Sequence, residues 1–147
     1  MPDDINSPVV AVGGVTVAAT TGALIAMGHR AGSAGLPFAA ISALVLHRAT
    51  SAVAIGMVFT GLALHIVAIF VWCFIFVWMV EHAIHNEIVT GVLVAAAQFI
   101  VSGIATWATG QGSASVLPLG DRIVFAAILA ISLVVGIRLA FPRSHSV

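Results

Sequence analysis

The chain has 147 residues, of which 61% are hydrophobic and only 7% charged, and its formal net charge is zero. It has too few polar side chains to solvate the surface of a water-soluble enzyme, and it lacks the basic excess that nucleic acid requires. Between Arg48 and Glu81 no formally charged residue occurs, over a stretch longer than the roughly 20 residues that cross a bilayer. The sequence therefore predicts an all-α integral membrane protein, a single membrane domain over residues 1–147 with four transmembrane helices in a small bundle.

The first apolar segment covers residues 8–28 and follows Ser7, a residue type that caps helices, with Pro8 at the first helical position. Small residues recur in this segment at intervals of four, so they lie along one stripe where the backbone of a neighbouring helix can approach closely. We expect this small-residue stripe to be a helix-packing face. It consists of Gly14, Ala18, Gly22 and Ala26.

The connection that follows contains two similar pairs, His29 with Arg30 and His47 with Arg48. Arginine presents a fork of donors that fits phosphates and carboxylates, so these pairs predict contact with lipid headgroups or with a partner subunit. Residues 37–46 lie between the pairs and form either a short helix at the membrane interface or the first turns of the next span. The residue pattern leaves both possibilities open.

The second span, residues 51–80, is predicted to be unusually long, because as a helix it would measure about 45 Å against a hydrocarbon core of about 30 Å. We therefore expect this second helix to tilt or to extend beyond the membrane. Its last turns carry aromatic side chains around the whole circumference, and these face lipid, a flat ligand or another protein. They are Phe70, Trp72, Phe74, Phe76 and Trp78.

Near the middle of this span lies His65, and ionisable residues at that depth usually face a bundle interior, a cavity or a ligand. Gly61 lies one turn earlier and Trp72 two turns later on the same face, which predicts room for a flat macrocycle beside the imidazole. The segment from Gly61 to His65 resembles the small-residue and histidine element of bacterial light-harvesting helices, and this resemblance implies axial ligation of haem or of a chlorophyll-type pigment. The alternative is a neutral His65 that hydrogen-bonds to a neighbouring helix, for example through Gln98.

A dense group of polar residues follows the second span. If the helix continues past residue 80, Glu81, His82 and His85 project to a similar side and could bind one transition-metal ion. The alternative is an ordinary polar turn in which Asn86 caps the third span, residues 87–107.

The third and fourth spans carry few polar side chains. Gln98 and Ser102 offer hydrogen bonds to a neighbouring helix from the third span. The fourth span covers residues 121–140, and its Ser132 and Gly136 form a second, shorter pair of small residues for helix packing.

The function class follows from these features. No residue arrangement typical of hydrolytic chemistry is visible, so we expect a protein that is not an enzyme. The leading hypothesis is a non-catalytic subunit that packs within a larger, energy-transducing membrane complex, with membrane lipid and other membrane subunits as partners. Two alternatives are a tetrapyrrole-binding or electron-transfer protein that uses His65, and a small carrier or proton channel. The arginines of the first connection predict an N-terminus outside a bacterial inner membrane.

Overall fold

The computed structural model describes residues 6–46, 54–108 and 117–141, which form five α-helices. Four of these helices are long and apolar enough to cross a membrane. The prediction of an all-α membrane protein with four spanning helices is therefore confirmed. In chain order the helices are α1 (Asn6–Arg30), α2 (Leu36–Leu46), α3 (Ile55–His82), α4 (Glu87–Ala108) and α5 (Leu119–Ala140).

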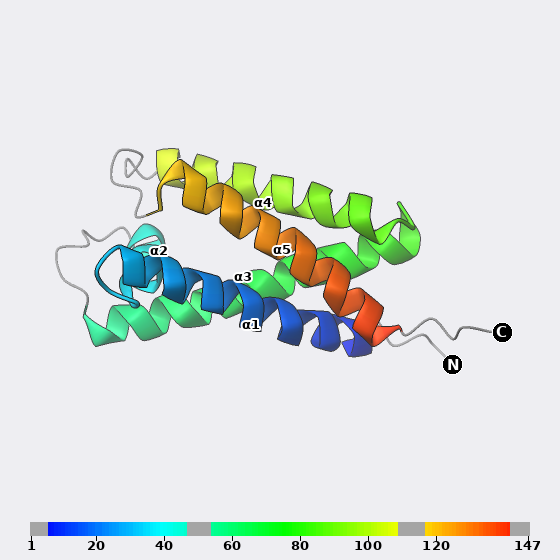
Figure 1. Cartoon of the computed structure of the whole chain (residues 1–147), viewed down its shortest axis with the longest axis horizontal. Helices are drawn as coiled ribbons and strands as arrows, with labels where there is room; N and C mark the ends of the chain where they lie inside the picture. The colour runs from blue at the N-terminus through cyan, green and yellow to red at the C-terminus, as the bar shows by residue number, and fades with distance from the viewer. Residues whose placement is uncertain (1–5, 47–53, 109–116, 142–147) are drawn as a thin grey trace.

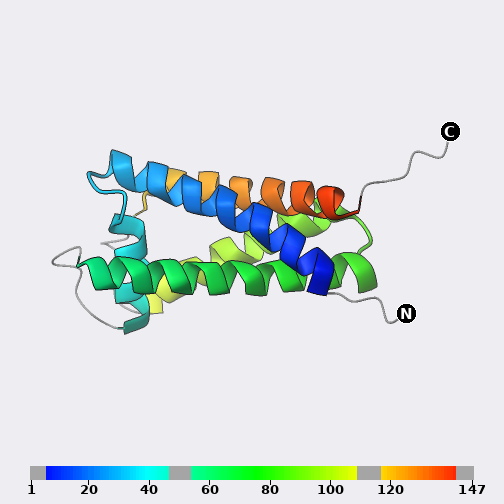
Figure 2. The same cartoon turned by 90° about the horizontal axis from the view of Figure 1, so that it is seen from below.

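The four long helices run along the long axis of the molecule, and α1 begins at the same end of the bundle where α5 ends (Figure 1). The short helix α2 lies crosswise to them at the opposite end, beside the start of α3 (Figure 2). An even number of crossings returns the chain to the side from which it started. The elements at the α2 end are therefore the end of α1, the start of α3, the end of α4 and the start of α5.

The prediction that the second helix is unusually long is wrong. The second helix is α2, which has only 11 residues, and the long helix is the third, α3, with 28. At about 1.5 Å per residue α2 measures roughly 16 Å, too little to cross the hydrocarbon. The separate short helix is thus the arrangement observed for residues 37–46. The reason is packing, since α2 turns its buried residues back onto α3, and a helix continuous with α3 could not reach that surface.

The turn between α3 and α4 satisfies the backbone groups of both helix ends. The Asn86 side-chain oxygen accepts hydrogen bonds from the N–H groups of Ile88 and Val89, each 3.1 Å long. The predicted cap at Asn86 is therefore confirmed. On the other side of the turn, the N–H of Ala83 donates to the carbonyl of Met79 at 3.0 Å, which completes the last turn of α3.

The core lies where α1 packs against α5 and α3. Gly136 lets α5 approach α1 closely, because a Cβ added there would lie 2.9 Å from the Cα of Val12. Gly13 of α1 faces the ring of Phe70 of α3 so tightly that no side chain fits between them. The largest fully buried side chains are Phe76, Leu129, Leu133, Val12, Val77 and Val94.

The small-residue stripe of α1 is not part of this core. Its four residues, Gly14, Ala18, Gly22 and Ala26, are all exposed. No atom of another helix in the described chain lies within 4 Å of a Cβ placed on either glycine. The helices described here therefore leave the stripe uncovered, because α1 turns inward the neighbouring face that contains Thr20, and helix packing at the stripe stays a prediction.

Candidate functional site

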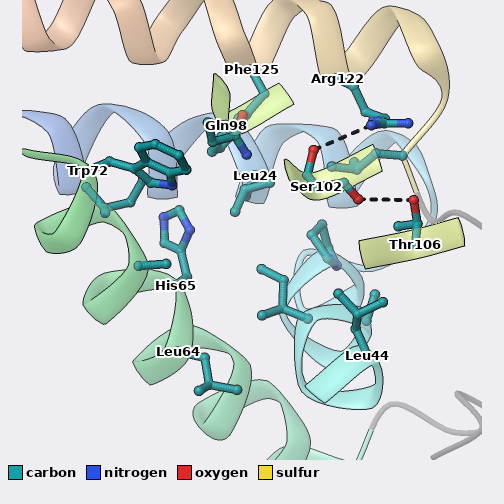
Figure 3. A pocket seen from close by; sticks show the side chains of 16 residues that line it. Leu24, Leu44, Leu64, His65, Trp72, Gln98, Ser102, Thr106, Arg122 and Phe125 are labelled. Atoms are coloured by element: carbon teal, nitrogen blue, oxygen red, sulfur yellow. Dashed lines mark hydrogen bonds between the residues drawn. The ribbon is translucent and has the colours of Figure 1, made fainter. Parts of the chain in front are cut away.

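A cavity of about 300 Å³ lies among all five helices. Ligand sites typically measure about 300–1,000 Å³, so this volume is at the lower end of their range. Figure 3 shows two polar ends, with His65 and Trp72 of α3 at one and Arg122 of α5, beside Ser102 and Thr106 of α4, at the other. The walls between them are mainly apolar and include Leu24, Pro37, Ile41, Leu44, Leu64 and Ile69.

His65 is held by contacts from three other helices. It is only 5% exposed, and its Nε2 lies 3.2 Å from the hydroxyl oxygen of Thr20 on α1. That hydroxyl donates to the carbonyl of Thr16 at 2.7 Å, so its oxygen accepts a hydrogen from the imidazole nitrogen. The rings of Phe38 and Phe125 meet the imidazole edge-on, with centroids 6.0 and 6.2 Å away. This arrangement fits a neutral histidine in one fixed orientation.

The space predicted at Gly61 for a macrocycle is filled by the backbone of α2. A Cβ added to Gly61 would overlap the backbone carbonyl of Phe38, so α2 fills the place where the side chain is missing. The Nε2 atom of His65 is engaged by Thr20, which leaves this nitrogen unavailable as an axial ligand in the observed arrangement. The hydrogen-bond partner on a neighbouring helix is thus Thr20, whereas the predicted partner, Gln98, lines the same cavity.

Arg122 packs against one face of α4 at the other end of the cavity. Its Nη2 lies 3.3 Å from the carbonyl oxygen of Phe99 and 3.4 Å from the hydroxyl of Ser102, which are long distances for hydrogen bonds. The guanidinium carbon lies 4.8 Å from the centre of the Phe99 ring, within the range of a cation–π contact. A Cβ on Gly103 would lie 3.0 Å from Nη2, so this glycine makes room for the cation. We call Phe99, Ser102 and Gly103 the Arg122 seat.

The other arginines that the structure describes have carboxylate partners. Arg30 pairs with Asp121 at 2.7 Å, and Arg138 pairs with Glu87 at 3.0 Å. Both arginine side chains are more than half exposed, whereas Arg122 is half-buried. Within the described ranges no carboxylate pairs with Arg122. Because an unbalanced charge is costly in a partly apolar site, this end of the cavity favours an anion.

The predicted metal site at the end of α3 does not form. α3 ends at His82 and the backbone of His85 has a φ of 53°, so Glu81, His82 and His85 do not share one helical face. His82 Nδ1 lies 3.1 Å from the Trp78 carbonyl oxygen, and His85 Nδ1 lies 3.0 Å from the Val80 carbonyl oxygen. Each ring nitrogen thus hydrogen-bonds to a backbone carbonyl in the last turns of α3. Among residues 6–46, 54–108 and 117–141, no three His, Cys, Asp or Glu side chains are placed to hold a metal ion.

The two His-Arg pairs are described only in part. His29 and Arg30 are exposed at the end of α1, and Arg30 ties this end to the start of α5 through Asp121. His47 and Arg48 lie outside the described residues. Contact of these pairs with lipid headgroups or with a partner subunit therefore stays a prediction.

Two residues of this region were not predicted as site residues from the sequence: Thr20, which contacts His65, and Arg122, which lines the cavity. Thr16 and Thr20 recur one turn apart on α1, and such a pair predicts a polar line along one face of the helix. Arg122 falls just inside the predicted fourth span, where an ionisable residue is a site candidate by default.

The fold and the cavity define a small helical integral membrane protein with a partly polar site inside its bundle. A comparison with known protein families, with curated proteins and with solved structures found no match. The proposals below therefore stand on the geometry of this chain.

Proposed function

We propose that this chain is a non-catalytic subunit of a larger, energy-transducing membrane complex, and that the outer face of α1 meets the partner. The observation that supports the proposal is the exposed small-residue stripe, which runs along α1 from Gly14 to Ala26. In a membrane, helices associate through close van der Waals contact at small residues, because lipid tails are as apolar as the side chains.

Other glycines of the bundle lie where a neighbouring group approaches the helix closely. A glycine inside a helix costs about 0.5–1 kcal/mol relative to alanine, and a close neighbour offsets this cost. Gly13, Gly61 and Gly136 each face a neighbour that leaves no room for a side chain. Gly14 and Gly22 face nothing within 4 Å in the described chain. Their presence in α1 is explained if another chain approaches there.

The partner that we propose is a transmembrane helix of a different membrane protein. Val10 is 64% exposed and lies one turn before Gly14 in the same row, and Ile25 is 44% exposed and lies beside the stripe, so both can pack against such a helix. The location that fits this role is a bacterial inner membrane with the N-terminus outside, supported by the arginines of the first connection.

One substitution with a matched control tests this role. Ala18→Ile fills the middle of the stripe, and Ala96→Ile adds the same side chain at an exposed alanine of α4. We expect wild-type protein and the Ala96→Ile variant to migrate as one large assembly on native gels of mildly solubilised membranes. We expect the Ala18→Ile variant to migrate as the free subunit, because an added side chain separates closely packed helices.

Three results would contradict the proposed role. If wild-type protein in native membranes is monomeric, no partner occupies the stripe. If its mass is twice that of the chain, the occupant is a second copy instead of a different protein. A Soret band in the purified protein that disappears in His65→Ala would favour the tetrapyrrole alternative instead.

A further inference from the structure

The cavity combines a cation at one end with an apolar interior, and it is independent of the outer face of α1. We propose that it binds a single-chain amphiphile with a carboxylate head group, such as a long-chain fatty acid, and that Arg122 recognises the carboxylate. Trp72 lines the other end of the cavity and would face the apolar tail of this ligand (Figure 3).

The charge of Arg122 points to an anionic head group. The more exposed Arg30 and Arg138 both pair with carboxylates of the chain, whereas the half-buried Arg122 pairs with none in the part that the structure describes. Its contacts to Phe99 and Ser102 are a carbonyl and a hydroxyl, which carry no charge. A ligand carboxylate would supply the missing negative charge, and guanidinium and carboxylate fit one another through two parallel hydrogen bonds.

The Arg122 seat shows that the guanidinium is positioned rather than loosely placed. Three residues on one face of α4 receive it: the ring and carbonyl of Phe99, the hydroxyl of Ser102, and the open space at Gly103. Ser102 also donates its own hydrogen to the Phe99 carbonyl at 2.9 Å, which turns its oxygen lone pairs toward Arg122. A preorganised cation of this kind loses less entropy when an anion binds.

The position of the cation suits an amphiphile that comes from a membrane. Arg122 stands in the first turn of α5, next to Asp121, which is paired with Arg30 at the end of the bundle. His65 lies deep within α3, at the other end of the cavity. A ligand with its head at Arg122 and its tail toward His65 would therefore lie along the bundle, as lipids lie along a leaflet.

Size and access favour one hydrocarbon chain. A volume of about 300 Å³ is small for a ligand site, and the two tails of a phospholipid need more room. Ala68 of α3 lines the cavity and is also exposed, so the cavity opens on the side of α3. From their common turn α3 and α4 diverge along the bundle (Figure 1).

Quenching of Trp72 by bromine reports tail binding directly. The chain has three tryptophans, so Trp78→Phe and Trp107→Phe leave Trp72 as the single indole. This protein, in a neutral detergent, is titrated with terminally brominated undecanoate and with the matching brominated undecanol. We expect saturable quenching by the acid at a concentration about tenfold or more below that for the alcohol, because hydrogen bonds to charged groups are the stronger kind.

Two arginine variants separate recognition of the head group from general effects of charge. Arg122→Gln should remove the preference for the acid, so that acid and alcohol quench alike. Arg138→Gln is the matched control, since Arg138 is exposed and paired with Glu87 at the other end of the bundle, and it should keep the wild-type preference. Circular dichroism and the elution volume in detergent show whether each variant is folded.

Three results would overturn the proposal. Equal quenching by acid and alcohol in the folded protein that keeps Arg122 and has Trp72 as its single indole shows that charge is not recognised. Retention of the preference in folded Arg122→Gln assigns recognition to another group. A brominated phosphatidylglycerol that displaces the acid at lower concentration shows a phospholipid site. The binding test leaves the proposed subunit role untouched, because it uses purified protein without a partner.

Discussion

The cavity has a packed end around His65 and an end around Arg122 that we call open, because no carboxylate of the described residues pairs with that cation. The two ends hold their polar groups in different ways. At the packed end the chain supplies a hydrogen-bond acceptor, Thr20, and α2 fills the space beside Gly61. At the open end the chain supplies neutral contacts to a cation but, among the described residues, no carboxylate. A polar residue in the middle of an apolar span can thus be satisfied within its own chain. The residue whose charge is left unbalanced is the better indicator of a ligand.

The largest expected effect is at the packed end, where Gly61→Ala drives a methyl group into the Phe38 carbonyl. Backbone cannot yield as a side chain can, so we expect the free energy of unfolding to fall by about 3 kcal/mol or more. Gly56→Ala is the matched control on the same helix, because a Cβ there meets nothing within 4 Å. It should leave stability unchanged or raise it by up to about 1 kcal/mol. Unfolding in mixed micelles measures both, and equal effects would show that α2 does not pack on Gly61.

The next effect tests the partner of His65. Thr20→Val keeps the shape of the side chain but removes the acceptor, and a buried N–H without a partner costs about 1–3 kcal/mol of unfolding free energy. Thr60→Val is the control, because Thr60 is exposed and its hydroxyl bonds only to its own helix at Gly56. Its effect should stay within about 0.5 kcal/mol. If the two variants are equally stable, His65 does not depend on Thr20.

Several features of the fold are predictable from local sequence. Uncharged apolar runs predict the four spanning helices, since a backbone in lipid must satisfy its own hydrogen bonds. The polar turn predicts the cap at Asn86, because an Asn cap bonds to N–H groups only two and three residues away. Both signals are contained within one segment of the chain.

The rest depends on which helices meet, and a single periodic pattern does not contain that information. Gly61 predicts that another group packs closely against α3 at this position. Whether that group is a macrocycle or the backbone of Phe38 depends on how a different segment of the chain folds. In the same way α1 carries a stripe of small residues and a stripe with Thr16 and Thr20, and its packing against both α3 and α5 selects the second as the inner face. That Arg122 has no carboxylate partner among the described residues, although Asp121 precedes it in the chain, is visible only in the structure.

A smaller effect distinguishes a paired arginine from Arg122. A double-mutant cycle of Arg30→Gln and Asp121→Asn should give a coupling of about 0.2–1 kcal/mol, because Arg30 is 65% exposed and water screens the pair. The coupling should fall as salt is added. Unfolding of the two single variants and the double variant gives its value. A coupling well above this range would mean that the pair at the end of α1 is shielded from water, for example by a partner.

The smallest expected effect on stability is at the Arg122 seat, where it separates binding from folding. Gly103→Ala places a Cβ 3.0 Å from Nη2 of Arg122, and the flexible end of this side chain can move away. The added methyl favours the helix by about 0.5–1 kcal/mol, so stability should change by less than about 1 kcal/mol in either direction. The displaced guanidinium no longer meets a carboxylate in the same geometry, and the preference of Trp72 quenching for brominated acid over alcohol should weaken.

Gly120→Ala at the start of α5 meets open space and should change neither quantity. If Gly103→Ala keeps the full preference for brominated acid over alcohol, recognition of the carboxylate does not depend on the contact of Arg122 with α4. The open end would then not be preorganised.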